Sequence, residues 1–126
     1  FDYRPYSVEL EMCKRYYERF TSTTATSNAY MSYGLGMCSG TTTATVPLYY
    51  VEKRSVPTLG FTTASQYAMS NSTDGSVAVT AISQGQVGVK AGNAQTTVAS
   101  GLTAGNATKL ISNNNNTSYI EVSAEL

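Results

Sequence analysis

The sequence predicts a mainly β fold, an antiparallel β-sandwich or jelly roll, as one domain over residues 1–126 with one α-helix at about residues 7–20. A length of 126 residues is typical of a single domain with its own core. Charged residues make up 13% of the chain, about half the usual share, and half of them lie in the first twenty positions. After Phe20 the chain consists of short runs rich in Val, Ile, Thr and Tyr, separated by Gly, Asn and Pro.

The first twenty residues contain the one helical pattern. An apolar stripe recurs at i, i+3, i+7 and i+10, at Leu10, Cys13, Tyr17 and Phe20, and Met12 and Tyr16 widen it. Ser7 is a potential N-cap after Pro5. We therefore expect the helix to pack its apolar stripe on a sheet, with Cys13, Tyr16 and Tyr17 in the core.

The charges of this segment fit the opposite side of the same helix. Glu11 and Arg15, and likewise Lys14 and Glu18, are spaced i,i+4, which favours ion pairs along a helix. The segment is thus interpreted as the solvated face of an amphipathic helix. A charged binding patch is the alternative.

The remainder is predicted to form short strands at spacings of roughly ten residues, as in sandwiches and jelly rolls. Val77, Val79, Ile120 and Val122 alternate with polar or small residues, which indicates sheets with one buried face. The expected strands are Ala29–Cys38, Thr42–Val51, Thr58–Thr63, Gln66–Ser70, Ser76–Ser83, Gln86–Ala91, Thr96–Ala99, Lys109–Ile111 and Ser118–Ala124.

Composition excludes several classes of function. The net charge is zero, whereas phosphate binding requires a basic surplus, so we expect no nucleic-acid partner. No apolar run reaches eighteen residues, and we expect no membrane insertion. His is absent and Cys13 and Cys38 are the two cysteines, so a four-ligand zinc site is excluded. We expect free thiols, with a disulfide as the alternative. Because the first residue is Phe, we expect a processed product or a piece of a longer protein.

No catalytic, metal-binding or cofactor-binding residue stands out. Without His, acid–base chemistry would need carboxylates held in a cleft, and nothing singles out a pair. Asp2 and Asp74 are the two aspartates, too few for a calcium cluster. The sequence contains no nucleophile elbow and no phosphate-binding loop. We therefore expect a protein that is not an enzyme, with a glycosidase pair left open as an alternative.

Polar loops and tyrosines are the candidates for ligand contact. Exposed tyrosine beside Asn and Ser is a common way to build a sugar-binding or protein-binding surface. Tyr30, Tyr33, Tyr49 and Tyr67 could serve there or lie in the core, and the sequence does not decide between these roles. The candidate contact residues of the two Asn-rich loops are Asn71, Asp74, Asn113, Asn114, Asn115 and Asn116.

The opening segment FDYRPYSVELEMCKRYYERF resembles a junction segment of tail fibres and other structural proteins of tailed bacteriophages. The specific part is Glu9-Leu10, followed by Cys13-x-Arg15-Tyr16-Tyr17. Val56-Pro57-Thr58-Leu59 and the C-terminal segment 120–126 follow in the expected order, while Ser70 to Ala107 has no counterpart.

This resemblance implies a virion protein that forms homotrimers, with the helix near the threefold axis. Arg15 would pair with Glu11 or Glu18 across subunits. Its partners would be copies of itself, other virion proteins and a host-surface glycan. Two alternatives stay open. One is a structural virion component without a ligand. The other is an enzyme, either a glycan depolymerase or a self-cleaving maturation module.

Overall fold

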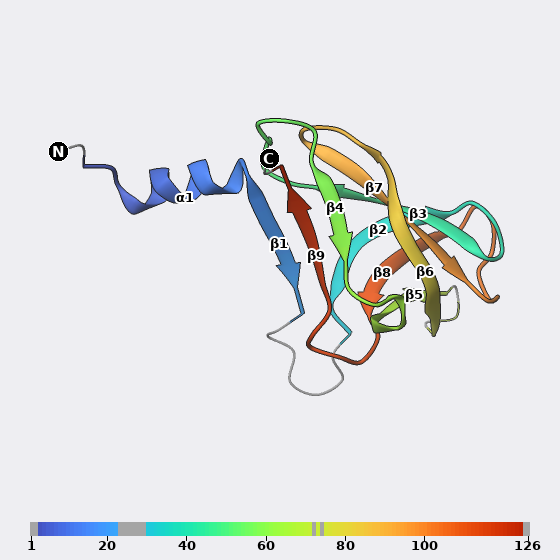
Figure 1. Cartoon of the computed structure of the whole chain (residues 1–126). Coiled ribbons are helices and arrows are strands. Elements are labelled where there is room, and N and C mark those ends of the chain that lie inside the picture. Colours follow the sequence, from blue (N-terminus) through green and yellow to red (C-terminus); the bar gives the residue numbers. More distant parts are fainter. Residues whose placement is uncertain (1–2, 23–29, 72, 74, 125–126) are drawn as a thin grey trace.

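The fold is a β-body from which one helix projects. The computed structural model describes residues 3–22, 30–71, 73 and 75–124. Over these residues the chain forms helix α1 (Tyr6–Lys14), nine strands and a short 3-10 helix, η1 (Ala64–Gln66). Helix α1 extends away from the strands (Figure 1). The prediction of a mainly β fold with one N-terminal α-helix is confirmed.

Three strands form a small antiparallel sheet. Strand β9 (Tyr119–Ser123) lies in the middle, between β1 (Tyr17–Thr21) and β4 (Thr58–Phe61). Ser123 faces Tyr17 on one side and Thr58 on the other. The last strand of the chain therefore holds the first strand, and with it the base of α1, against the body.

The remaining six strands close into a barrel. Their order is β2 (Ser32–Cys38), β3 (Thr43–Tyr49), β7 (Ala91–Val98), β6 (Ser76–Val87), β5 (Tyr67–Ser70) and β8 (Ala107–Ser112). The barrel closes because β8 pairs with both β5 and β2. All described strand pairs are antiparallel, as predicted. A closed barrel beside a three-stranded sheet does not confirm a sandwich or a jelly roll.

The largest correction to the predicted elements concerns residues 7–20. The helix ends at Lys14, and Tyr17 to Thr21 form a strand. Residues 17–21 form a strand because Tyr, Phe and Thr favour extended backbone and because β9 is available to pair with them. A second correction concerns the expected strands Ser76–Ser83 and Gln86–Ala91, because β6 runs on across Gln84 and Gly85 through a register shift.

The core is continuous between the barrel and the small sheet. On β3, Ala44, Val46 and Leu48 alternate into the interior, and Ile120 and Val122 do the same on β9. Leu59 of β4 belongs to the same buried cluster. Fully burying an aliphatic side chain of this kind stabilises the fold by about 1.5–3 kcal/mol.

Tyr67 bonds the small sheet to the barrel from a buried position on β5. Its hydroxyl accepts hydrogen bonds from Thr62 N (3.0 Å) and Thr62 Oγ1 (2.9 Å), and it donates to the carbonyl of Tyr119. Its ring lies 5.8 Å from the ring of Tyr33, between ring centroids. Burial raises the pKa of the Tyr67 hydroxyl. Tyr67 is thus a core residue.

Candidate functional site: the N-terminal arm and its anchor

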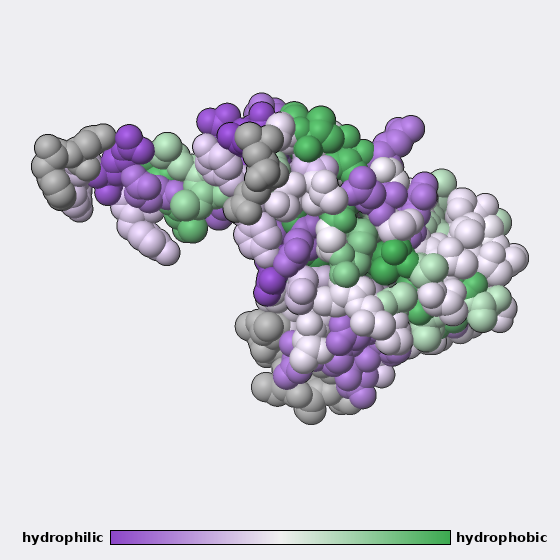
Figure 2. Space-filling model, in the orientation of Figure 1, coloured by the Kyte–Doolittle hydropathy of each residue, from purple (hydrophilic) through white to green (hydrophobic). Residues whose placement is uncertain are grey.

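The N-terminal arm, residues 3–14, is the part of the chain that packs least against the rest. No residue of α1 is buried, and Tyr6 is 81% exposed. Val8, Leu10 and Met12 are also exposed large apolar side chains. Figure 2 shows hydrophobic and hydrophilic residues side by side along this projecting helix. An arm of this kind exposes apolar surface that the fold itself leaves uncovered.

The helix begins without a side-chain cap. Pro5 occupies the N-cap position, and its carbonyl accepts hydrogen bonds from Val8 N (3.0 Å) and Glu9 N (3.2 Å). The predicted cap at Ser7 is wrong, because Ser7 already lies inside the helix. A nine-residue helix is too short to be stable in isolation. Its stability must therefore come from its C-terminal end or from a partner.

The C-terminal end is tied firmly to the body. Three successive carbonyls accept hydrogen bonds: Lys14 O from Lys53 Nζ (2.6 Å), Arg15 O from Arg54 N (3.1 Å), and Tyr16 O from Ala124 N (2.7 Å). The guanidinium of Arg54 also lies 5.0 Å from the centre of the Tyr16 ring. We name Glu18, Lys53, Arg54 and Ala124 the anchor. It sets the direction in which the arm leaves the body.

A buried ion pair forms the centre of the anchor. The Lys53 side chain is 0% exposed, and its ammonium is bonded to the carboxylate of Glu18. The same carboxylate oxygen accepts a hydrogen bond from Val51 N (2.8 Å). A positive charge at the last carbonyls of a helix is favourable, because the partial charge there is negative. Glu18 is thus used inside the chain, and Lys14 pairs with Glu11 in place of the predicted Glu18.

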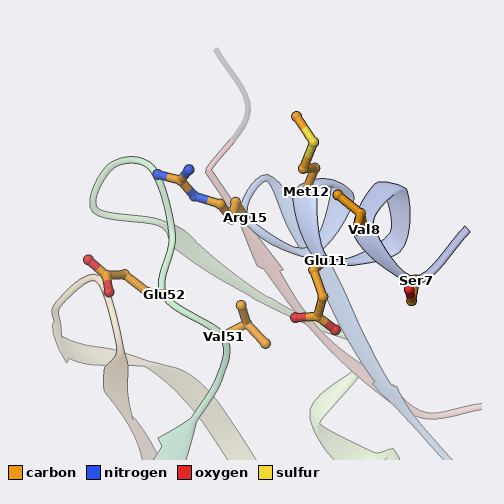
Figure 3. A pocket seen from close by; sticks show the side chains of 7 residues that line it. All are labelled: Ser7, Val8, Glu11, Met12, Arg15, Val51 and Glu52. Carbon is orange, nitrogen blue, oxygen red and sulfur yellow. The ribbon is translucent and has the colours of Figure 1, made fainter. Parts of the chain in front are cut away.

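A pocket of about 550 Å³ separates the arm from the loop after β3. Its described lining is Ser7, Val8, Glu11, Met12, Arg15, Val51 and Glu52. In Figure 3 the side chain of Glu11 extends from the helix toward the loop that carries Val51 and Glu52. Glu11 pairs with Lys14 (3.1 Å), in place of the predicted pair with Arg15. The lining thus combines apolar side chains with two carboxylates and one guanidinium.

The structure splits the predicted packing residues into three groups. Leu10 and Cys13 are exposed on the arm, so the predicted docking of the helix on its own sheet is wrong. Arg15 and Tyr16 lie at the junction, both exposed. Tyr17 and Phe20 lie on β1, both partly buried, and Phe20 packs against the core.

Tyr17 takes part in an exposed polar cluster on the small sheet. Its hydroxyl donates to Glu121 Oε1 (3.0 Å) and accepts from Arg19 Nε (3.0 Å), while Arg19 also binds Glu121 (2.8 Å). The hydrogen bond from Arg19, together with that from Tyr17, lowers the pKa of the Glu121 carboxyl. The bond to Glu121, followed by that to Tyr17, raises the pKa of Arg19. This cluster fastens β1 to β9.

Two of the predicted contact asparagines are used within their own loops. Asn71 Oδ1 accepts from Thr73 N (3.1 Å) and Gly75 N (2.8 Å). Asn115 Oδ1 accepts from Ser118 N (2.9 Å).

The other loop candidates differ in their surroundings. The amide of Asn113 donates to Ser65 O (3.2 Å). Asn114 adopts a left-handed backbone (φ 49°), and Asn116 is exposed. Asp74 lies outside the described residues.

The four tyrosines whose role the sequence left open fall into two groups, buried and exposed. Tyr67 is buried, and Tyr33 is partly buried with its hydroxyl bonded to Ser118 O (2.9 Å). Tyr30 and Tyr49 are exposed. Tyr30 lines a pocket of about 280 Å³ with Ser70, Gly75, Ser76, Lys109 and Ile111. Tyr30 and Tyr49 are therefore the ones open to a partner.

The anchor was not predicted from the sequence. Lys53 was assigned no role, whereas its side chain is among the most buried in the described chain. The available signal was the run YYVEKR, which places two cations directly after a strand.

In the described part of the chain, no group of three His, Cys, Asp or Glu residues is arranged to hold a metal ion. Cys13 and Cys38 are both free thiols. None of the described helices has the length and apolar character required to cross a membrane.

In comparisons with known proteins, no family model, no curated protein and no solved structure matched the chain.

Proposed function

We propose that this chain is a self-assembling domain of a phage tail fibre or receptor-binding protein, which forms homotrimers through its N-terminal arm. The observation that carries the proposal is the arm itself. It is held at its base by the anchor, yet its apolar side chains contact no other part of the described fold closely enough to be buried. Rigid presentation of an uncovered apolar helix suits association, because little conformational entropy remains to be lost on binding.

The resemblance of the opening segment supports the viral part of the proposal. Its specific residues include Leu10, Cys13, Tyr16 and Tyr17, which lie on the arm, at the junction and on β1. We accordingly propose the virion as its location and other virion proteins as further partners.

Assembly is tested by measuring the molar mass of the chain. Light scattering after gel filtration should give three times the chain mass, and Leu10→Asp should shift the protein towards monomer. Val56→Asp serves as the matched control, because Val56 is also an exposed apolar residue but lies outside the arm. Specific assembly should be complete at a chain concentration of about 100 μM. A wild-type chain that is still monomeric at that concentration would refute the proposal.

Host-surface attachment is the second part of the proposal, with a neutral glycan as the ligand. The pocket beside Tyr30 supports it, because an exposed ring next to serine hydroxyls can stack on a sugar and bond its hydroxyl groups. A glycan array should show binding that Tyr30→Ala abolishes and Tyr49→Ala leaves intact. Binding that survives Tyr30→Ala would place the ligand elsewhere.

A structural virion role without ligand is the competing proposal. The internal hydrogen bonds of Asn71 and Asn115 favour it, because amide oxygens that hold a loop are less available to a sugar. No binding across diverse host polysaccharides would favour this role.

We propose no enzymatic activity. The carboxyl of Glu121 has a lowered pKa and is paired with Arg19, and Glu52 is exposed and lies 3.6 Å from Lys90. A carboxyl with a lowered pKa, such as that of Glu121, does not keep a proton near neutral pH for a leaving group, and the carboxylate of Glu52 is engaged with Lys90. Polysaccharide degradation that is lost in Glu52→Gln or Glu121→Gln would overturn this view.

A further inference from the structure

The outer face of β2 and β3 carries an apolar surface that the body leaves in water. Leu35 is 70% exposed, Met37 59% and Tyr49 76%, and Pro47 is partly exposed beside them. We name these four residues the outer patch. Hollows of about 440 and 430 Å³ flank it, and Leu35 and Pro47 line both. No charged residue appears among the described residues lining either hollow.

The orientation of β2 makes this surface unlike an incidental exposed side chain. Its large apolar residues Leu35 and Met37 face outward, whereas Gly34 and Gly36 face β3 and the interior. A Cβ at Gly36 would lie 2.8 Å from Val46 Cα, so the interior has no room for a side chain there. A strand that turns glycines inward and Leu and Met outward is built to bury its outer face against something else.

We propose that the outer patch receives the N-terminal arm of a second copy of this chain. This inference rests on the proposed self-assembly and names the surface that completes it. The chain then contains both halves of one contact, an uncovered apolar arm and an uncovered apolar patch. Such a contact is heterologous, and copies related by rotation close it into a ring.

The charges of the two surfaces are compatible. The outer patch has no charged member, so any unpaired charge brought onto it would lose hydration without compensation. On the arm, Arg4 lies 3.7 Å from Glu9 and Lys14 lies 3.1 Å from Glu11. The arm therefore brings charges that are already paired.

The available area also fits. Tyr3, Tyr6 and Tyr49 are about four-fifths exposed, and at about 150–250 Å² per ring residue they supply about 350–600 Å². Leu10, one helical turn from Tyr6 on the same face, and Leu35 and Met37 of the patch add about 100–200 Å² at the usual area per buried group. Apolar side chains on one face of the arm and on the patch thus supply about half to four-fifths of the roughly 1,000 Å² of a specific interface, before backbone and polar atoms are counted.

The geometry directs the arm to a neighbour. The anchor fixes the base of the arm, and α1 leaves the body in a direction away from β2 and β3 (Figure 1). The arm could reach its own patch only if the anchor opened. A contact between two patches would leave the apolar side chains of both arms in water.

A mixing experiment separates these arrangements. Tyr6→Glu damages the arm and leaves the patch intact, whereas Leu35→Glu damages the patch and leaves the arm intact. Each variant alone should associate at least about 30-fold more weakly than wild type, as for the loss of one interface hot spot. Thr97→Glu, an exposed position on the neighbouring strand β7, is the control and should assemble normally.

The mixture of the two damaged variants decides the outcome. Native mass spectrometry of full-length chains, one isotope-labelled, should show a heterodimer of one Tyr6→Glu and one Leu35→Glu chain, joined by the remaining intact arm and patch. A mixture that stays monomeric overturns the inference, as does a Leu35→Glu variant that assembles like wild type. If wild type assembles and Tyr6→Glu alone is defective, self-assembly through the arm stands and only this docking surface is wrong. A monomeric wild type removes both proposals.

Discussion

The buried Lys53–Glu18 pair gives the sharpest prediction, because one atom can be removed from a site with defined partners. Lys53→Met keeps an unbranched apolar side chain as far as the ε position, with sulfur in place of the δ carbon, and deletes the ammonium. The Glu18 carboxylate, 16% exposed, then keeps one hydrogen bond, from Val51 N, and the carbonyl of Lys14 loses its donor.

The expected loss follows from these contacts. Removing one partner of a buried ion pair costs about 3–5 kcal/mol. Because Glu18 keeps some contact with water, we expect the lower end, about 3 kcal/mol in the free energy of unfolding. For a domain stabilised by about 5–15 kcal/mol this is a large share. It corresponds to a fall of about 1–3 M in the urea midpoint at the usual slopes.

The assay is urea unfolding of wild type, Lys53→Met, Glu18→Gln and the double variant, at one concentration and one oligomeric state. The double variant should recover part of the loss, since neither charge is then left buried alone. Hydrogen exchange should also show faster exchange in α1 for Lys53→Met. A change below about 1 kcal/mol in the single variant, or no coupling in the cycle, would show that the anchor does not hold the arm as argued.

Three further predictions concern the body. Tyr67→Phe removes a buried hydroxyl with its bonds to Thr62 and to the Tyr119 carbonyl, and the two backbone groups then keep only a longer bond to each other (3.4 Å). The free energy of unfolding should fall by about 1–3 kcal/mol in chemical denaturation, while Tyr49→Phe on the surface should change little. Gly36→Ala forces a Cβ against the β3 backbone, so the free energy of unfolding should fall by about 1–3 kcal/mol and the melting temperature by several degrees. An unchanged melting temperature would contradict the close approach of β2 to β3. The hydrogen bond from Arg19 lowers the folded-state pKa of Glu121. The contribution of Glu121 to folding stability is therefore present above the unfolded pKa near 4.5 and is lost as the pH falls through the folded pKa. Glu121→Gln should flatten the pH dependence of stability in that acid range, and parallel stability curves for the two proteins would argue against this reasoning.

Much of the strand pattern was predictable because it depends on local alternation. Val46 and Leu48 alternate with Thr45 and Pro47, and Ile120 with Glu121, so one face had to be apolar whatever it packed against. The charge-rich N-terminal segment was also correctly predicted to begin as a helix, although its projection from the β-body was not predicted. The site was predicted only in part, since the arm residues Leu10 and Cys13 were identified but assigned to intramolecular packing.

The sequence by itself determined the mainly β class, the N-terminal place of the α-helix and the low share of charged residues after Phe20, because each depends on neighbours in the chain. Tertiary structure alone decided that Tyr17 to Thr21 leave the helix and pair with β9, that six strands close into a barrel, and that Lys53 is buried against Glu18. The physical reason is that backbone hydrogen bonds between distant strands, and the burial of a charge between distant segments, carry no period that a local pattern can display.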